Sequence, residues 1–268
     1  MSTAPEWHAP ATLEEALALK AERGDEATVV AGGTFLAILV NQRLFVPTCL
    51  LSLGHIDQLE RIEVGCELRL GAMVRHRGVE RSADVRAGWP SLAHAFSVVA
   101  SPRVRNQATV GGVLADADYA SDPPSMLCAL GARVVAASVR GRREIPMDEL
   151  ITGYYETSLE PDELIVEVHV PRVERAVYRK FRSRSHEDRP CVSVAAAESN
   201  GVRRIVVGAV AARPQSFPDF AAFDDPTEVG EAYANAIEPI ADVRGSAGYR
   251  RRVIAVEVRR ALEELAQA

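Results

Sequence analysis

The segments Ala31-Gly32-Gly33-Thr34-Phe35-Leu36 and Thr109-Val110-Gly111-Gly112-Val113-Leu114-Ala115 are the most informative parts of this chain. We call them the first and the second glycine segment. Each follows an apolar stretch, and the glycine pair leaves the backbone without obstructing side chains. Successive main-chain N–H groups can then converge on negatively charged oxygens. Two such segments predict a long ligand with a phosphate-bearing middle and a group at each end.

The first glycine segment lies between an expected strand over residues 27–31 and an expected helix over residues 35–44. The β-branched run favours the strand, and the N-terminal end of the helix would point back at the glycine turn. No Gly-x-Gly-x-x-Gly and no Gly-Lys-Ser/Thr occurs, so neither a Rossmann fingerprint nor a P-loop is present. A diphosphate would therefore be held by another backbone arrangement.

The rest of the chain mixes helix and strand patterns. Thr12 and Glu15 form a capping box for a helix that ends at Gly24, and Asn200-Gly201 indicates a hairpin turn. Residues 164–170 alternate as a half-buried antiparallel strand would. Other strands are expected over residues 48–53, 67–73, 134–139, 176–181, 192–197 and 205–210, helices over 89–100, 125–130, 226–236 and 249–266, and turns over 54–66 and 141–143.

Composition bounds the class of protein. The 268 residues suffice for a large core and two or three subdomains. A net charge of −6 argues against a nonspecific nucleic-acid binder, and no stretch approaches the roughly 18 apolar residues of a membrane span. Four scattered cysteines and no signal peptide are typical of reduced thiols in a cytoplasmic protein, and the cysteines form no zinc or iron–sulfur set.

Three aspartates follow the second glycine segment. The spacing of Asp116, Asp118 and Asp122 matches no EF-hand, so no metal site is expected here. A carboxylate could accept hydrogen bonds from the hydroxyls of a ribose. The alternative is that these are solvated loop aspartates that cap the helix expected near Ser125.

Taken together, these segments resemble the FAD-binding medium subunit of the molybdenum hydroxylases, the carbon monoxide dehydrogenase and xanthine dehydrogenase family. The specific motif is SPRVRNQATVGGVLA over residues 101–115. Supporting motifs are AGGT at 31–34, ASDPP at 120–124, TSLEPDEL at 157–164, KF at 180–181 and DVRGSAGYRR at 242–251. The resemblance covers essentially the whole chain.

The resemblance implies an α+β fold: a two-subdomain FAD-binding fold of the PCMH type, followed by a smaller C-terminal α+β domain with an antiparallel sheet and helices. Residues 1–170 would form the FAD-binding domain, with subdomains at about 1–54 and 55–170. Residues 171–268 would form the C-terminal domain of the medium subunit.

The resemblance also implies which residues hold the FAD. The first glycine segment would bind the diphosphate, and the second would form another cradle near the diphosphate and the isoalloxazine. Asp122 would take a sugar hydroxyl, and Leu164 and Lys180 would line the flavin site. The full predicted set is Ala31, Gly32, Gly33, Thr34, Phe35, Leu36, Ala100, Thr109, Val110, Gly111, Gly112, Val113, Asp122, Leu164 and Lys180.

In this family the flavin passes electrons from iron–sulfur clusters to an external acceptor. The implied partners are a molybdopterin-binding large subunit and a 2Fe-2S small subunit, and the assembly would be oligomeric. No catalytic acid or base on this subunit is implied. The first alternative is a stand-alone FAD-dependent oxidoreductase that acts on a small molecule. The second is a binding or assembly protein that has lost the flavin.

The chain departs from the family pattern at a few positions. Phe35 follows Gly-Gly-Thr where the family usually has a polar residue, and Val113 replaces the asparagine of Gly-Gly-Asn. Asp116 stands where histidine is common, Tyr119 where proline is common, and Arg189 where an aromatic or small residue often faces the flavin. Losing the asparagine removes one hydrogen bond worth about 0.5–1.5 kcal/mol. The departures predict an altered flavin affinity or an altered redox partner.

Overall fold

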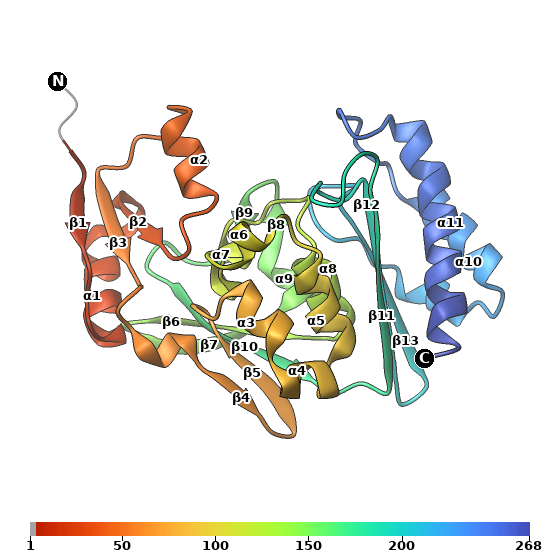
Figure 1. Ribbon diagram of the computed structural model, residues 1–268, viewed down its shortest axis with the longest axis horizontal. Coiled ribbons are helices and arrows are strands. Elements are labelled where there is room, and N and C mark those ends of the chain that lie inside the picture. The colour runs from red at the N-terminus through yellow and green to blue at the C-terminus, as the bar shows by residue number, and fades with distance from the viewer. Residues whose placement is uncertain (1–3) are drawn as a thin grey trace.

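The computed structural model describes residues 4–268, without the side chains of residues 221 and 222. Its strands form four sheets, with the orders β1-β3-β2, β4-β5-β10-β6-β7, β11-β12-β13 and β8-β9. The first three follow one another across the molecule from the N-terminal to the C-terminal end (Figure 1). No helix among the described residues combines the length and apolarity needed to cross a membrane.

The first sheet carries the first glycine segment. It consists of the parallel strands β1 (Glu6–His8), β3 (Cys49–Ser52) and β2 (Ala27–Val30). Helix α1 (Leu13–Arg23) begins after Thr12, whose Oγ1 accepts the N–H of Glu15, as predicted. Strand β2 ends at the first glycine segment, and α2 (Leu36–Asn41) follows it. Helix α2 is shorter than the helix expected over residues 35–44.

The central sheet is antiparallel, with β10 (Leu164–Pro171) in the middle between β5 (Glu67–Gly71) and β6 (Arg133–Ser138). On one face, Ile165 and Val168 pack among the central helices, while Leu164 and Val166 belong to the cluster around α1. The expected antiparallel strand over residues 164–170 is present, but the expectation that it is half-buried was wrong. Both faces are covered, which is why the strand opens with an unbroken apolar run.

Two edge strands were expected as turns. Strand β4 (Ile62–Val64) lies within the connector at 54–66, and β7 (Gly141–Pro146) includes the turn expected at 141–143. Both strands are largely exposed, and β7 carries the charged run Arg142-Arg143-Glu144. Edge strands of this kind lack the apolar alternation that identifies a strand in the sequence.

Short helices cover the face of the central sheet that bears Ile165 (Figure 1). The second glycine segment, expected as a loop, begins one of them, and residues 76–88 form two helices that were not predicted. The seven helices are α3 (His76–Arg81), α4 (Ala83–Gly88), α5 (Pro90–Ser97), α6 (Pro102–Arg105), α7 (Val110–Ala115), α8 (Pro123–Ala129) and α9 (Met147–Leu150).

The C-terminal sheet lies between two layers of helices. One of its faces, including Tyr178, packs on the central helices, and the other packs on α10 (Pro226–Ala236) and α11 (Ala247–Leu265). Its strands are β11 (Arg175–Phe181), β12 (Val192–Ser199) and β13 (Val202–Gly208). Asn200 and Gly201, with φ of 51° and 72°, form the predicted hairpin turn between β12 and β13.

The chain passes from one sheet to the next near the expected domain limits. The first sheet ends at Ser52 and β4 begins at Ile62, while β10 ends at Pro171 and β11 begins at Arg175. The small β8 (Ile151–Gly153) and β9 (Glu156–Thr157) form a hairpin of their own. A division into domains at 54 and 170 stays a prediction. Single turns of 3-10 helix occur at Gly24–Glu26, Asp57–Glu60 and Pro218–Ala222.

Candidate functional site

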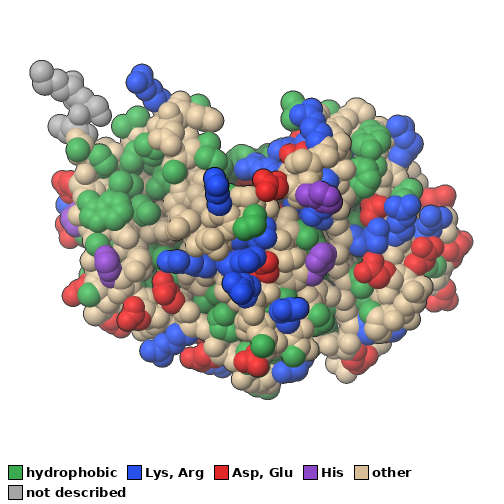
Figure 2. All heavy atoms as spheres, in the orientation of Figure 1, with side chains coloured by type: hydrophobic (Ala, Val, Ile, Leu, Met, Phe, Trp, Pro, Cys, Tyr) green, Lys and Arg blue, Asp and Glu red, His purple; other side chains and the backbone are tan. Residues whose placement is uncertain are grey.

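A cavity of about 460 Å³ is enclosed by residues of the first sheet, the central helices and the loop before β10. Figure 2 shows the molecule hollowed at its upper edge, between the region of α2 and the C-terminal part. Of the predicted cofactor-binding residues, all except Val110 and Lys180 line this cavity. The sequence motifs therefore converge on one place.

The first glycine segment presents unpaired backbone donors to this cavity. Gly33 has a φ of +68°, a left-handed conformation that favours glycine, and it turns the chain from β2 toward α2. Within the described residues, the N–H groups of residues 32–36 donate to no acceptor. All five residues line the cavity. Such a run of free donors suits an anion with several oxygens.

Gly32 sets how close this segment lies to the rest of the site. A Cβ at Gly32 would lie 2.1 Å from the carbonyl oxygen of Gln107 and 3.0 Å from the Cα of Ala108. Both contacts are with backbone, which cannot move aside as a flexible side chain can. Gly32 thus lets the first segment lie directly against the residues that lead into the second.

The second glycine segment uses its donors internally, so the expectation that it offers bare N–H groups was wrong. It begins α7, and the Oγ1 of the N-cap residue Thr109 accepts the N–H of Gly112 at 3.1 Å. The neighbouring N–H groups of Val110, Gly111 and Val113 donate to the carbonyls of Val74, Ala72 and Thr109.

What the second segment contributes is close packing. A Cβ at Gly111 would lie 2.7 Å from the Cβ of Ala72, so this glycine lets α7 rest on the end of β5. At Gly112 a Cβ would lie 2.8 Å from Thr109 Oγ1 and 3.8 Å from the Cβ of Ala31. Gly112 therefore faces the first glycine segment. The side chain of Val110 is buried in the core, which is why Val110 does not line the cavity.

Two cations hold the turn after α5 in place. Lys180 donates to the carbonyl of Val98 at 2.8 Å, and Arg105 donates to the carbonyls of Val99 and Ala100 at 2.8 and 3.0 Å. Ala100 has a φ of +40°, which is rare for a residue with a side chain. The contacts keep Val99 and Ala100 in the cavity wall. Lys180 was expected on the cavity surface, but it lies behind the wall.

Asp122 braces the same wall. Its carboxylate accepts the hydroxyl of Tyr178 at 2.7 Å and the ammonium of Lys180 at 2.8 Å, and the residue is 3% exposed. These contacts tie α8 to β11 of the C-terminal sheet. The side chain makes no bond to the start of α8, so a capping role for Asp122 is excluded. Both carboxylate oxygens already have partners within the chain, so a sugar hydroxyl would have to add a further hydrogen bond. The predicted contact of Asp122 with a sugar hydroxyl stays a prediction.

Asp116 gives the cavity an acid that titrates near neutral pH. Burial, and then the neighbouring Asp118, raise its pKa to about 7, while Arg189 opposes the shift. Arg189 pairs with Asp118 at 2.7 Å and brings the loop after β11 into the cavity lining. Partial protonation of Asp116 reduces its repulsion of a bound anion.

His76 was not predicted and supports the second segment from beneath. Its Nε2 lies 3.2 Å from the carbonyl of Thr109. Burial lowers the pKa of His76 to about 4, so the ring is neutral and Nε2 carries the donating hydrogen. Sequence reasoning also missed the apolar lining at Leu53, Met73, Leu159 and Ile165. A usable signal is that Leu53 directly follows β3 and Met73 lies two residues beyond β5, so both stand at the ends of strands.

Phe35 has a partner across the site. Its ring stacks on that of Tyr155 with centroids 5.7 Å apart and planes inclined by 7°. Tyr155 has a φ of +59° and lies in the turn between β8 and β9. The departure at Phe35 therefore joins the first glycine segment to the β8–β9 hairpin.

The closing sequence motif ties the C-terminal part to the site. Asp242 accepts the hydroxyl of Tyr119 at 3.1 Å and also contacts Arg244 and the fully buried Arg250. Burial opposes ionisation of Asp242, but these donors outweigh it and hold its pKa at about 2. The departure at Tyr119 thus adds a contact between the C-terminal part and the segment that lines the cavity.

The site's chemistry fits a dinucleotide with a diphosphate in its middle. Free N–H groups lie at the first glycine segment, glycines keep the space between the two segments clear, and apolar residues complete the walls. Residues 2–173 match the family "FAD binding domain in molybdopterin dehydrogenase". The chain belongs to this family. FAD is its cofactor, and its activity is that of an FAD-dependent oxidoreductase, as the resemblance implied.

Relatives of this chain match it beyond residue 173 as well. The chain is 34% identical to the 6-hydroxypseudooxynicotine dehydrogenase complex subunit alpha of Paenarthrobacter nicotinovorans, over 94% of this chain and 90% of that protein. It is also 34% identical to the nicotine 6-hydroxylase medium subunit of the same organism, over 96% of each chain.

A solved structure supports the fold. Carbon monoxide dehydrogenase from Hydrogenophaga pseudoflava, in a form that lacks the Mo-pyranopterin moiety, matches with a TM-score of 0.91 and 30% identity. The match covers 100% of this chain and 99% of the other. The α+β fold expected for a medium subunit of this family is therefore confirmed.

Proposed function

We propose that this chain is the FAD-binding electron-transfer subunit of a heteromeric molybdenum-type oxidoreductase and passes electrons from iron–sulfur clusters to an external acceptor. The observation that carries the binding role is the run of free N–H groups at residues 32–36 on the cavity surface. The family match supports the cofactor, and the names of the relatives support the place in a complex.

The chain's own residues would hold the cofactor and shape its surroundings. The free N–H groups would bind the diphosphate oxygens, and Gly112 would leave room for the cofactor beside the second segment. The wall at Val99 and Ala100, held by Lys180 and Arg105, would exclude water from one side. When bound, the flavin supplies the capacity to accept and release electrons.

The proposed partners are a molybdopterin-binding large subunit and a 2Fe-2S small subunit in an oligomeric assembly. One relative is named a complex subunit and another a medium subunit, which supports an assembly of several chains. This chain's cysteines Cys49, Cys66, Cys128 and Cys191 are all free thiols at separate places in the fold. Reduced thiols also support the proposed cytoplasmic location.

Purification from the native host would test this proposal. An affinity-tagged chain should copurify with two further chains, molybdenum, iron and FAD in fixed ratios, and substrate should reduce the flavin only in the complex. A yellow chain without partners, whose flavin a small molecule reduces directly, would instead establish the stand-alone oxidoreductase. A folded, colourless chain that fails to bind added FAD would contradict both.

A further inference from the structure

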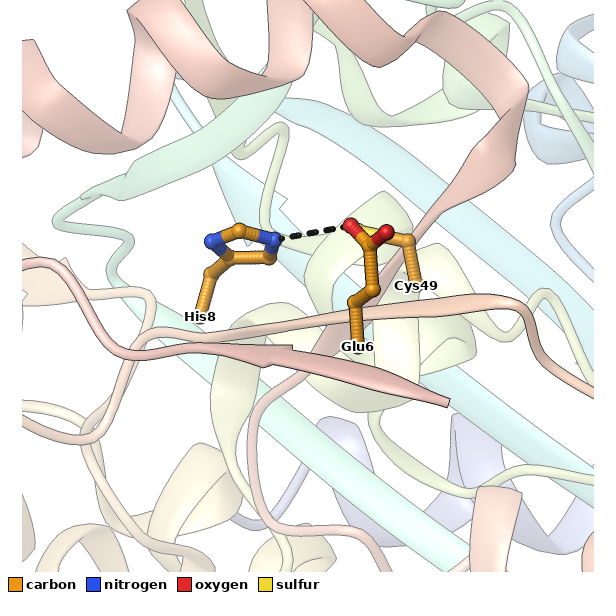
Figure 3. Close-up of side chains that lie close together, drawn as sticks. All are labelled: Glu6, His8 and Cys49. Carbon is orange, nitrogen blue, oxygen red and sulfur yellow. Dashed lines mark hydrogen bonds and ion pairs between the residues drawn. The ribbon is translucent and has the colours of Figure 1, made fainter. Parts of the chain in front are cut away.

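A mixed group of side chains lies at the edge of the first sheet, away from the cavity. Glu6 and His8 alternate on β1, so they project from the same face, and Glu6 pairs with Cys49 of the parallel strand β3. Figure 3 shows the carboxylate, the imidazole and the thiol turned toward one another. Within the described residues, this is the one group of three or more His, Cys, Asp or Glu side chains placed to share an ion.

The spacing of the Glu6 and His8 ligand atoms suits a small tetrahedral cation, and the Cys49 thiol lies close enough to join them after a small side-chain movement. One ligand atom from each residue lies within 4.8 Å of the others. His8 Nε2 and Glu6 Oε2 are 3.4 Å apart. Ligand bonds of 2.0–2.2 Å in a tetrahedron separate nitrogen and oxygen by about 3.3–3.5 Å. The two side chains are joined by a hydrogen bond in this structure, at a separation that two ligands of one zinc ion can also have.

We propose that Glu6, His8 and Cys49 form a Zn²⁺ site. Thiolate, imidazole and carboxylate together are the donors that zinc accepts, whereas Ca²⁺ and Mg²⁺ require oxygen donors. Cys49 is buried and Glu6 is exposed, so the ion would lie at the surface with its fourth position open to water. Binding converts the Cys49 thiol to a thiolate, and its proton leaves to solvent.

Arg23 is the competitor for this site. Its guanidinium lies 3.3 Å from Glu6 Oε2, the same oxygen that faces His8. Zinc binding would require Arg23 to release this oxygen, and the nearby Glu22, at 3.7 Å, offers it another carboxylate. Removing the charge of Arg23 should therefore tighten zinc binding, which gives the proposal a gain-of-affinity test.

The ion would link β1 to β3 across the edge of the sheet. Strand β1 is three residues long and pairs only with β3 among the described strands. A ligand that binds the folded chain and not the unfolded chain raises stability by mass action. Zinc should therefore raise the melting temperature, and it should leave the flavin spectrum unchanged because the cavity lies elsewhere.

The test uses the purified, FAD-loaded chain, stripped of metal by a chelator and dialysed against micromolar zinc chloride. Bound zinc is measured by mass spectrometry, and melting temperatures are measured with and without zinc. We expect one zinc per chain. His8→Ala and Cys49→Ser should each weaken zinc binding by at least about 100-fold, while Arg23→Gln should tighten it. Cys66→Ser, which removes the exposed thiol, is the matched control and should bind as the parent does.

Cobalt(II) gives an independent readout, because a thiolate ligand adds a charge-transfer band and a tetrahedral site adds strong long-wavelength bands. Both should be absent in Cys49→Ser. The proposal is overturned if the parent binds no stoichiometric zinc, if His8→Ala and Cys49→Ser bind zinc as the parent does, or if Cys66→Ser removes the binding. His8 is partly exposed, so His8→Ala keeps the test valid even if Cys49→Ser lowers stability.

Discussion

The two glycine segments look alike in sequence and differ in how they use their backbone. The first leaves the N–H groups of residues 32–36 free, whereas the second pairs the N–H groups of residues 110–113 within the fold. The residue two positions before each glycine pair accounts for part of the difference. Thr109 supplies a side-chain oxygen that caps α7, and Val30, its counterpart, has none. In the second segment the Thr109 side chain takes the Gly112 N–H, while the carbonyls of Val74 and Ala72 take those of Val110 and Gly111.

The largest effect is expected from filling the space between the two segments. Gly112→Leu would place a side chain beside Ala31 and against Thr109 Oγ1. We expect FAD affinity to fall by at least about 100-fold while the chain stays folded. Flavin titration and far-UV circular dichroism measure the two properties. Gly65→Leu, at a position with only one ordinary contact at 3.8 Å, is the control. A fully flavinated Gly112→Leu chain would refute the assigned role of Gly112.

Gly32→Ala would break the contact that brings the segments together. The added Cβ would meet the backbone of Gln107 at 2.1 Å, so the free energy of unfolding should drop by about 2–3 kcal/mol, with a loss of flavin. A Cβ at Gly33 would meet no atom within 4 Å. Gly33→Ala should therefore lower the free energy of unfolding only through the strain of its left-handed φ, by about 1–2 kcal/mol. Urea unfolding of both variants tests the order; a more stable Gly32→Ala variant would mean that the segments can separate at little cost.

Asp116 makes the second segment's side of the cavity sensitive to pH. The pKa of Asp116 is about 7 in the folded chain and 3.8 ordinarily. Between pH 3.8 and pH 7 the folded chain therefore keeps a proton on Asp116 that the unfolded chain has released. The free energy of unfolding should therefore fall with rising pH across this window, by up to about 1.4 kcal/mol per pH unit. Asp116→Asn should remove this contribution. Identical pH profiles of the two proteins in urea unfolding would assign the slope to other groups.

The smallest effect is expected at the cap itself. Thr109→Ala removes the acceptor of the Gly112 N–H and should cost about 1 kcal/mol of stability, and Thr109→Ser should restore most of it. Thr34→Ala, which removes the threonine of the first segment, should cost almost nothing, because no side chain caps α2. Equal losses at Thr34 and Thr109 in thermal unfolding would erase the distinction between the segments.

The sequence predicted the place of the site better than the way it works. Nearly all of the residues predicted from the glycine pairs and the family motifs line the cavity, although many other lining residues were not predicted. Thr12 and Asn200-Gly201 marked α1 and the last hairpin. The cap at Thr109 is compatible with the sequence, because threonine is a favoured N-cap residue, but a threonine before a glycine pair does not by itself distinguish a helix start from a loop. The roles of Lys180 and Asp122 were not readable, because their contacts join residues 58 positions apart. The helices over residues 76–88 and the charged edge strand β7 lack the periodicity that local patterns require.

The wall of the cavity depends on residues beyond the stretch that matches the FAD-binding domain of the family. The family match ends at residue 173, yet Tyr178 and Lys180 hold Asp122, and Lys180 also holds the turn at Val98. A protein cut after residue 173 would keep every glycine of both segments. It would leave the buried Asp122 carboxylate without the hydrogen bonds from Tyr178 and Lys180. The C-terminal sheet therefore supports the cavity wall. If the cavity holds the flavin as proposed, an excised FAD-binding fragment should lose flavin even where its own fold survives.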